Sequence, residues 1–314
     1  MIQPNDIGRY TMTYLFEDLE KLRNEYQLNG DLSFSETYIP GVRLFCAQKS
    51  VELNPLQYPA GIAILCQGEK QGMFGDSEFA YDEDNFLIVS VSTPIRCHTI
   101  ASQQKPAFGL FIDIELTGLE SIVKTMSFDS SVTYFNRSQG VEPVTMGREM
   151  KEVVAKLLKT LTDPIESKVL GQGIRQELIF RALQSDHGDA LYALTQDHSP
   201  HARVLKVVDH IKQNYSQQMT VEQLAELASM SQTSFHRSFK LVVGESPLQY
   251  VKKVKLGKAR SLIVHEGKSV SAAALEVGYN STSQFTREFK RYFNVTPTKA
   301  KDSGYAQIDV WSEG

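Results

Sequence analysis

Short apolar runs broken by turn residues dominate residues 34–116 of this chain. Three of these runs are residues 61–66, 86–91 and 108–114, and turn-forming breaks such as Gly75-Asp-Ser lie between runs. Runs of this length with turn signals between them predict the strands of an antiparallel sandwich or barrel.

The pattern then changes to a helical period. From Thr145 to Leu161 the apolar residues recur every three or four positions, which predicts an amphipathic helix. A second helix is expected from Ile165 to Leu183, and the polar stretch at 184–200 is expected to be a linker. Beyond it the pattern is helical throughout.

An internal repeat occupies this last part of the chain. The segment Phe235–Lys240 returns as Phe285–Lys290, and Ser246-Pro247 returns as Thr296-Pro297, both at an offset of 50 residues. Each copy reads as a helix, a short turn and a second helix. The phenylalanines recur at helical spacing, so we expect them in the core rather than stacked on bases.

Capping signals punctuate the two copies. Thr220–Gln223 and Ser281–Gln284 both have the spacing of a capping box, which predicts a helix start. Gly244 and Asn294 follow the second helix of each copy and suit a left-handed C-cap. Between the copies, residues 248–264 predict one connecting helix of about 25 Å.

Charge divides the chain of 314 residues, although its net charge is only -4. Residues 1–195 hold 17 Lys and Arg against 26 Asp and Glu, while residues 203–301 hold 16 against 7. A basic region behind an acidic one is expected when one half of a protein binds a polyanion.

A repeated helix-turn-helix motif would explain the positive charge of this region, because such motifs bind DNA. The second helix of such a motif lies in the major groove of DNA, and two copies joined by a rigid helix read successive groove segments about 34 Å apart. Basic side chains in and after these helices would contact phosphates. The residues expected in that role are Lys240, Lys252, Lys255, Lys290 and Arg291.

The segment from Arg203 to Lys301 resembles the AraC/XylS family of bacterial transcription regulators, most densely over Gly278–Pro297. Two departures are Asn294, where the family usually has Gly, and Ala300-Lys301, where it favours an aromatic residue and Arg. Asn tolerates the left-handed turn and Lys keeps a phosphate contact, so the resemblance stands.

This resemblance implies which positions face the bases. Arg, Gln and Thr have side chains suited to reading guanine, adenine and thymine. Arg237 and Arg287 recur in both copies, so holding the phosphate backbone or an acid of the domain is the alternative for each. The implied base-reading residues are Gln232, Thr233, His236 and Arg237 in the first copy and Thr282, Ser283, Gln284 and Arg287 in the second.

The first half resembles an AraC-type N-terminal domain, on residues 59–70, Gly75-Asp, Tyr81-Asp and 86–91. The resemblance implies a cupin-like β-barrel that binds a small effector, followed by helices that often dimerise. The expected fold is therefore α+β, with this barrel and flanking helices at about 145–183 within residues 1–195. An all-α double helix-turn-helix domain would follow at 196–314, with its core at about 203–301.

The effector candidates are aromatic and polar residues of the predicted barrel. They are Tyr58, Gln67, Tyr81, Ser92, His98 and Phe111. Ordinary core or surface positions are the alternative for each, and the sequence does not name the ligand. For dimerisation, one stripe of the first helix offers Met150, Val154, Leu157 and Leu161, with packing on its own barrel as the alternative.

The sequence shows no set of residues typical of an enzyme's active site. Cupin metal centres need two or more histidines with a carboxylate, and His98 is the only histidine before His187. We therefore expect no metal, no cofactor and no catalytic residues. Cys97 beside His98 could be an activated sensor thiol, but neighbouring residues of a strand point to opposite faces, which favours an inert buried thiol.

These features predict a cytoplasmic, sequence-specific regulator of transcription. Its partners would be double-stranded promoter DNA, a small-molecule effector, RNA polymerase and a second copy of itself. The N-terminus has no signal-peptide pattern, and no apolar run approaches the length of a membrane span. The alternative is a constitutive DNA binder whose first half only dimerises.

Overall fold

In the computed structural model, which describes residues 17–126, 139–196 and 199–302, ten strands form two antiparallel sheets. The six-stranded sheet has the spatial order β1 (Leu32–Glu36), β2 (Val42–Ala47), β9 (Ala107–Asp113), β4 (Gly61–Gln67), β7 (Asn85–Val89) and β10 (Val141–Thr145). The four-stranded sheet has the order β3 (Val51–Tyr58), β8 (Thr93–Ile100), β5 (Glu69–Phe74) and β6 (Ser77–Tyr81).

The predicted strands at 61–66, 86–91 and 108–114 are β4, β7 and β9, which confirms them. Strand β7 ends at Val89, two residues early, because Ser90 and Val91 leave the sheet for the helical part of the chain. The sheets form an open, cupin-like jelly roll. They do not close into the expected barrel, since no strand of one described sheet pairs with a strand of the other.

Each sheet buries alternate residues between the two sheets. In β8 the buried positions are Thr93, Ile95, Cys97 and Thr99, and the residues between them are more exposed. In β5 the same alternation turns Lys70, Gly72 and Phe74 inward. The interior is therefore lined by residues of both sheets.

Helices cover the other face of the six-stranded sheet. They are residues 17–25, α2 (Leu116–Thr125), α3 (Arg148–Leu161), α4 (Pro164–Leu183) and α5 (Asp189–Tyr192). Their apolar side chains and the outer face of the sheet form one continuous core. The expected helix from Thr145 starts later, at Arg148, because residues 141–145 pair with β7 as strand β10.

The dimerisation stripe predicted on α3 is wrong in this structure. Met150, Val154, Leu157 and Leu161 are 0–6% exposed and belong to the core shared with α4 and the sheet. The alternative, that the stripe packs on its own domain, is the one observed. A second copy could not reach these side chains without unfolding the chain's own packing.

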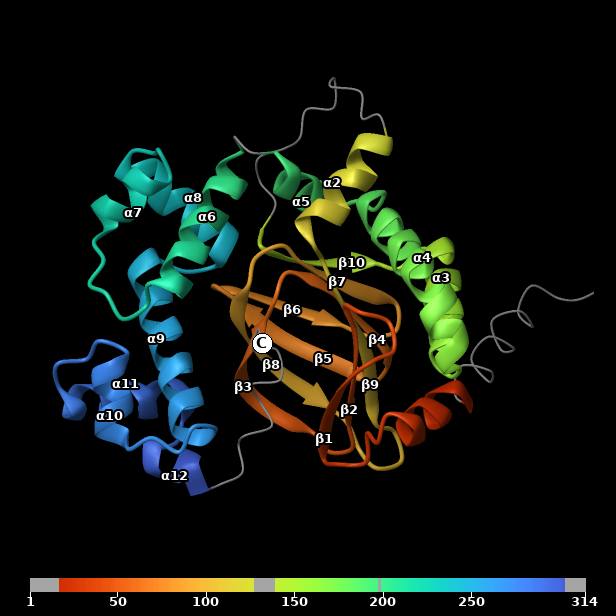
Figure 1. Cartoon of the computed structure of the whole chain (residues 1–314), viewed down its shortest axis with the longest axis horizontal. Helices are drawn as coiled ribbons and strands as arrows, with labels where there is room; N and C mark the ends of the chain where they lie inside the picture. Colours follow the sequence, from red (N-terminus) through yellow and green to blue (C-terminus); the bar gives the residue numbers. More distant parts are fainter. Residues whose placement is uncertain (1–16, 127–138, 197–198, 303–314) are drawn as a thin grey trace, which may run out of the picture.

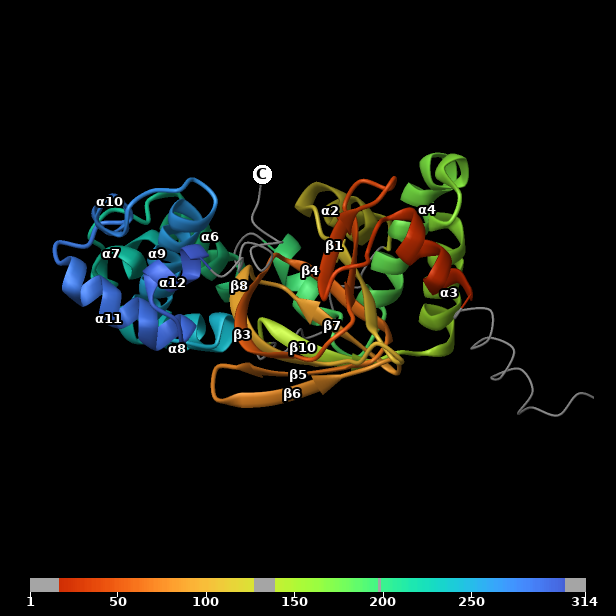
Figure 2. The ribbon, with the colours of Figure 1, turned by 90° about the horizontal axis from the view of Figure 1, so that it is seen from below.

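In the part of the chain described up to residue 302, seven helices follow the short helix η1 (Ala193–Thr195), which, with α5, lies in the stretch predicted as a linker. They are α6 (Pro200–Gln213), α7 (Val221–Leu227), α8 (Gln232–Val243), α9 (Pro247–Val264), α10 (Val270–Glu276), α11 (Thr282–Phe293) and α12 (Pro297–Asp302). Helices α7–α8 and α10–α11 form the two predicted helix-turn-helix units, and α9 is the predicted connector. In both views this helical half and the α3–α4 pair flank the sandwich on opposite sides (Figures 1 and 2).

Local capping explains where these helices begin and end. Thr220 and Gln223 form the predicted capping box, and Gly244 and Asn294 adopt the left-handed conformation at φ 81° and 59°. The second predicted box is only half formed. Ser281 accepts from the backbone of Gln284, whose side chain donates to Glu288 instead.

Candidate nucleic-acid interface and ligand site

Helix α8 is the second helix of the first unit. Ser231 caps it, while Phe235 and Phe239 are fully buried against the other helices of the unit. This burial confirms that the phenylalanines are core. The predicted base-reading residues lie on the opposite, exposed side of the helix: Gln232, Thr233, His236 and Arg237.

Helix α11 repeats this arrangement in the second unit. Phe285, Phe289 and Phe293 are buried in a core that is separate from that of the first unit. The predicted base-reading residues Thr282, Ser283, Gln284 and Arg287 are again exposed. Both units therefore present an exposed polar helix face.

The residues predicted to contact phosphates differ in exposure and in whether they form ion pairs within the protein. Lys290 and Arg291 are exposed at the end of α11. On α9, Lys252 pairs with Glu288 at 3.4 Å, and partial burial lowers the pKa of Lys255. Lys240 at the end of α8 pairs with Asp76 of the sandwich at 3.1 Å.

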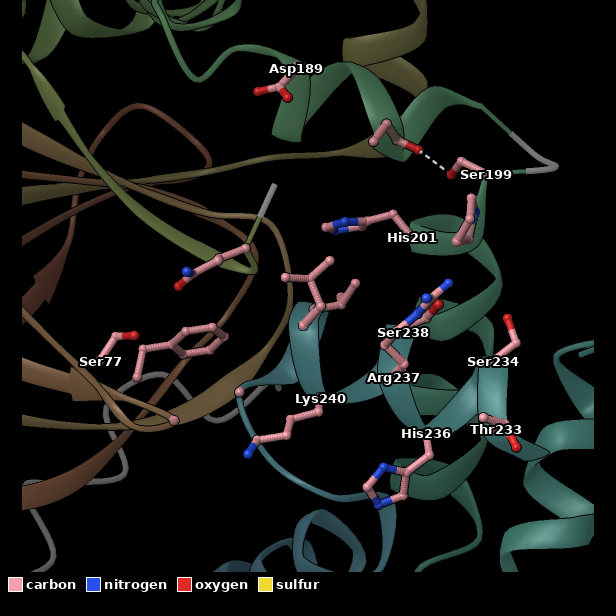
Figure 3. A pocket seen from close by; sticks show the side chains of 18 of the residues that line it. Ser77, Asp189, Ser199, His201, Thr233, Ser234, His236, Arg237, Ser238 and Lys240 are labelled. Carbon is pink, nitrogen blue, oxygen red and sulfur yellow. Dashed lines mark hydrogen bonds between the residues drawn. The ribbon is translucent and has the colours of Figure 1, made fainter. Parts of the chain in front are cut away.

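A cleft of about 1300 Å³ separates α8 from the sandwich. Its walls include the base-reading face of α8, residues of α6 such as His201, and the tip of the β5–β6 hairpin (Figure 3). At that tip Gly75 approaches Gly244 so closely that a Cβ on Gly75 would lie 2.5 Å from the Gly244 carbonyl oxygen. The hairpin thus docks on the C-terminal end of α8.

Residues 90–92 connect the sandwich to the first helix-turn-helix unit. Val91 is fully buried within the core of that unit. On either side of it, the Ser90 hydroxyl lies 3.0 Å from His201 Nε2, and Tyr250 donates to the Ser92 carbonyl at 2.9 Å. Burial lowers the pKa of His201 to about 4, so the imidazole is neutral at this contact near pH 7.

Three of the six effector candidates meet inside the sandwich. Tyr58, Tyr81 and Phe111 are 1–2% exposed and share one core with residues of both sheets. The Tyr58 and Phe111 rings lie 6.2 Å apart. These side chains lie between the sheets, in the interior of the sandwich.

The other three candidates lie elsewhere. Gln67 is at the end of β4, beside a register shift in its pairing with β9. Ser92 is at the contact with α9, and His98 lies on the outer face of β8, opposite the buried Cys97. The structure therefore does not bring these three into the interior.

A lysine inside the sandwich was missed as a candidate. Lys70 is 4% exposed, and its Nζ atom lies 3.7 Å from the centre of the Phe45 ring and donates to the Tyr58 hydroxyl at 3.4 Å. Burial lowers its pKa to about 8. The alternation that turns Lys70, Gly72 and Phe74 inward could have identified it in the sequence. The residues on both sides of Lys70 are polar, however, so the segment does not look like a buried strand.

Cys97 has the environment of an inert thiol. It is 1% exposed, and burial raises its pKa although the Lys70 charge acts in the opposite direction. Its neighbour His98 points to the other face of the strand, so the imidazole does not activate it. The expected opposite orientation of this pair is confirmed.

A pocket of about 600 Å³ lies where the sandwich meets α6. Arg43, which pairs with Asp113, forms part of its wall and lies 5.2 Å from the centre of the Phe111 ring. Lys206 and other residues of α6 form the opposite wall. The pocket is thus one aromatic ring away from the sandwich interior.

Two features of the described residues bear on other functions. None of the described helices is long and apolar enough to cross a membrane. Within the same residues there is no group of three or more His, Cys, Asp or Glu side chains that could hold a metal ion.

Comparison with curated proteins finds transcription regulators. An uncharacterized HTH-type transcriptional regulator of Haemophilus influenzae is 34% identical over 135 residues, which is 43% of this chain and 41% of that protein. The virulence regulon transcriptional activator VirF of Yersinia enterocolitica is 24% identical over 246 residues, 77% of this chain and 88% of VirF.

Solved structures show the same fold. An apo ToxT variant from Vibrio cholerae superposes with a TM-score of 0.56 at 11% identity, over 88% of this chain and 98% of ToxT. Wild-type ToxT with a bound unsaturated fatty acid gives the same TM-score over 87% of this chain and 97% of ToxT.

Family profiles match both halves of the chain. Residues 38–190 match the AraC-type transcriptional regulator N-terminus, and residues 224–303 match a helix-turn-helix domain. The second match contains α8 and α11 with their exposed polar faces. The chain belongs to the AraC family of DNA-binding transcription regulators.

Proposed function

We propose that this protein is a sequence-specific, effector-controlled transcription regulator that acts in the cytoplasm. Residues 1–195 would form the effector and dimerisation unit, and residues 196–314 the DNA-binding unit. The observation that carries the proposal is the pair of equivalent helices, α8 and α11, which present exposed polar faces on one rigid connector. RNA polymerase would be a further partner at the promoter.

DNA recognition would use both helices. The base-reading residues of α8 and α11 would enter successive major grooves, while Lys290 and Arg291 would hold phosphates. The tip of the β5–β6 hairpin, paired with Lys240 through Asp76, lies beside α8. DNA binding by α8 would therefore require the sandwich to move away from this helix.

The effector would bind inside the sandwich. ToxT, which shares this fold, has been crystallised with an unsaturated fatty acid and with an aryl-substituted butenoic acid, which supports a small organic ligand for the fold. Residues 90–92 continue directly from β7 and insert into the first helix-turn-helix unit. A ligand that shifts β7 would therefore also move residues 90–92 and change the orientation of the sandwich relative to the first helix-turn-helix unit. The ligand would act by shifting the population between two such orientations.

A homodimer would form through α4 rather than α3. Ile165 and Val169 are both 74% exposed, and Leu170 is 50% exposed, on a helix of 20 residues. This face is apolar but uncovered, as expected of an interface. Val169→Glu should give a monomer by light scattering, whereas Leu275→Glu, at a residue 72% exposed on α10, should not.

The constitutive DNA binder remains the second candidate, because it needs the same helices and the same dimer. It predicts that no small molecule changes DNA affinity. An effector-controlled protein predicts a change with its ligand and none with unrelated compounds.

Selection of DNA sites by the full-length protein from a random library tests the proposal. We expect a selected site with two half-sites about one helical turn apart. With about six to ten phosphate contacts, affinity should fall about 10³ to 10⁵ between 50 and 200 mM salt. Failure to enrich any sequence, or affinity that is independent of salt, would contradict DNA recognition.

A further inference from the structure

The Lys70 ammonium lies in the interior of the sandwich, and no acidic side chain that the structure describes pairs with it. Its one hydrogen bond to a described residue goes to the neutral Tyr58 hydroxyl, and its Nζ atom lies over the face of the Phe45 ring. Among the described residues no carboxylate forms an ion pair with it. A buried charge without a counter-charge is costly, and proteins keep such groups where they serve a purpose.

The described polar groups around Lys70 can all donate hydrogen bonds. Tyr58, Tyr81 and Cys97 are all buried, and they interact electrostatically with one another. Tyr58 and Cys97 also interact with the ammonium. The Tyr81 hydroxyl interacts with the Tyr58 hydroxyl, but no described residue meets it at full hydrogen-bond geometry. An unsatisfied hydroxyl beside an unpaired ammonium leaves at least two donors that need an acceptor.

Among the described side chains of this interior, the oxygen acceptors are hydroxyl groups. The buried polar residues of the described chain include Lys, Arg, Ser, Thr and His side chains, but no Asp, Glu, Asn or Gln. A neutral polyol could use the hydroxyls of this interior as donors and acceptors, but it would leave the Lys70 charge uncompensated. A carboxylate needs only donors, and it supplies the negative charge that Lys70 lacks.

We propose that the sandwich interior binds an organic anion, with its carboxylate held by the Lys70 ammonium and the Tyr58 and Tyr81 hydroxyls. The apolar body of the ligand packs on the rings of Phe45 and Phe111, which line the same interior. This inference rests on the proposed effector function and names the class of effector. It assigns Lys70 as the residue that selects the anion.

A ligand would reach the interior from the side of the pocket beside α6. Arg43 on the wall of this pocket lies over the Phe111 ring, and Tyr58 packs against the same ring. The buried Phe111 side chain would have to move for a ligand to pass. Because α6 forms the other wall, an anion on this path would also contact the DNA-binding half.

Matched pairs of acids and alcohols test the proposal on the full-length protein. The probes are hexanoate, decanoate and 3-phenylpropionate, each against its primary alcohol, by calorimetry at pH 7. We expect at least one acid to bind at least tenfold more tightly than its alcohol. Equal affinities within every pair, or no binding by any acid, would overturn the proposal.

Two variants identify the groups that hold the anion. Lys70→Met should weaken binding of the acid at least tenfold without affecting its alcohol, and Tyr81→Phe should weaken the acid several-fold. Lys49→Met, at an exposed lysine of the same domain, is the control and should bind as the wild type does. Unchanged acid binding by Lys70→Met would overturn the assignment.

The proposed function and this inference fail differently. If the wild type binds a selected DNA site and a neutral compound alters that binding equally in Lys70→Met, effector control stands and the anion is wrong. If the protein selects no DNA site, the regulator itself is wrong, whatever the acids do.

Discussion

The interior of the sandwich and the interiors of the two helix-turn-helix units are built differently. The helical cores consist mainly of aliphatic side chains and of aromatic rings that meet at an angle, such as Phe285 and Phe289 at 5.5 Å, and the buried Arg260 lies over the Phe293 ring. The sandwich interior is also aromatic, but it contains a lysine, two tyrosine hydroxyls and a thiol. The helical half is thus suited to binding at its surface, and the sandwich to binding inside.

Removing a ring from a helical core should have the largest effect. Phe285 is fully buried between Tyr279 and Phe289, so Phe285→Ala should lower the free energy of unfolding by about 3–5 kcal/mol. Chemical denaturation measures this loss, with Leu275→Ala as the exposed control. A loss below 1 kcal/mol would mean that the core does not depend on close packing.

Removing the Lys70 charge from the sandwich should raise the free energy of unfolding instead of lowering it. The pKa of Lys70 is about 8 in the folded chain against 10.5 when unperturbed, so the ammonium destabilises the ligand-free fold by about 3 kcal/mol at pH 7. Lys70→Met should therefore stabilise the protein. Denaturation of the two proteins at pH 7 checks the sign, and a destabilised variant would contradict it.

The same pKa fixes how this difference depends on pH. The destabilisation is complete below pH 8 and decreases as the pH rises toward 10.5, so the advantage of Lys70→Met should shrink between pH 7 and pH 9. Tyr58, Tyr81 and Cys97 face Lys70, and burial raises the pKa of each, so they stay neutral in this range. Carboxylate binding should weaken over the same range, because it needs the ammonium. If the stability difference between Lys70→Met and the wild type is constant with pH, the Lys70 charge does not cause it.

The sequence predicted the surface of the helical half better than the interior of the sandwich. Repeats, caps and phenylalanine spacing are local signals, and they located α8, α11 and their exposed residues. Lys70 could not be recognised in the same way, because its burial depends on strands far apart in the chain. The stripe on α3 was misassigned for the same reason, since only the packing of α4 against it decides which apolar face stays exposed.

Base recognition by α11 should show a smaller effect. If Arg287 reads a base edge, Arg287→Ala should lose about 1–3 kcal/mol of discrimination between the selected site and one substituted at that base. Fluorescence anisotropy with both DNAs measures it, and Arg237→Ala makes the equivalent test on α8. An equal loss on both DNAs would make the residue a phosphate contact.

The hairpin contact should have the smallest effect. Asp76 and Lys240 form an exposed ion pair, which contributes about 0.2–1 kcal/mol. Asp76→Ala should free Lys240 and raise DNA affinity up to a few-fold. Asp84→Ala, which removes an exposed acid paired with Lys151, is the control and should leave affinity unchanged. Weaker DNA binding by Asp76→Ala would mean that the hairpin supports α8 rather than competing with DNA.

The affinity of the full-length protein for its selected DNA site, measured with and without each carboxylate, tests the central claim most directly. The account predicts that at least one acid changes the DNA dissociation constant at least tenfold in the wild type and has no effect in Lys70→Met. DNA binding that no acid alters, or that an acid alters equally in both proteins, would contradict a sandwich that controls the helical half by binding an anion at Lys70.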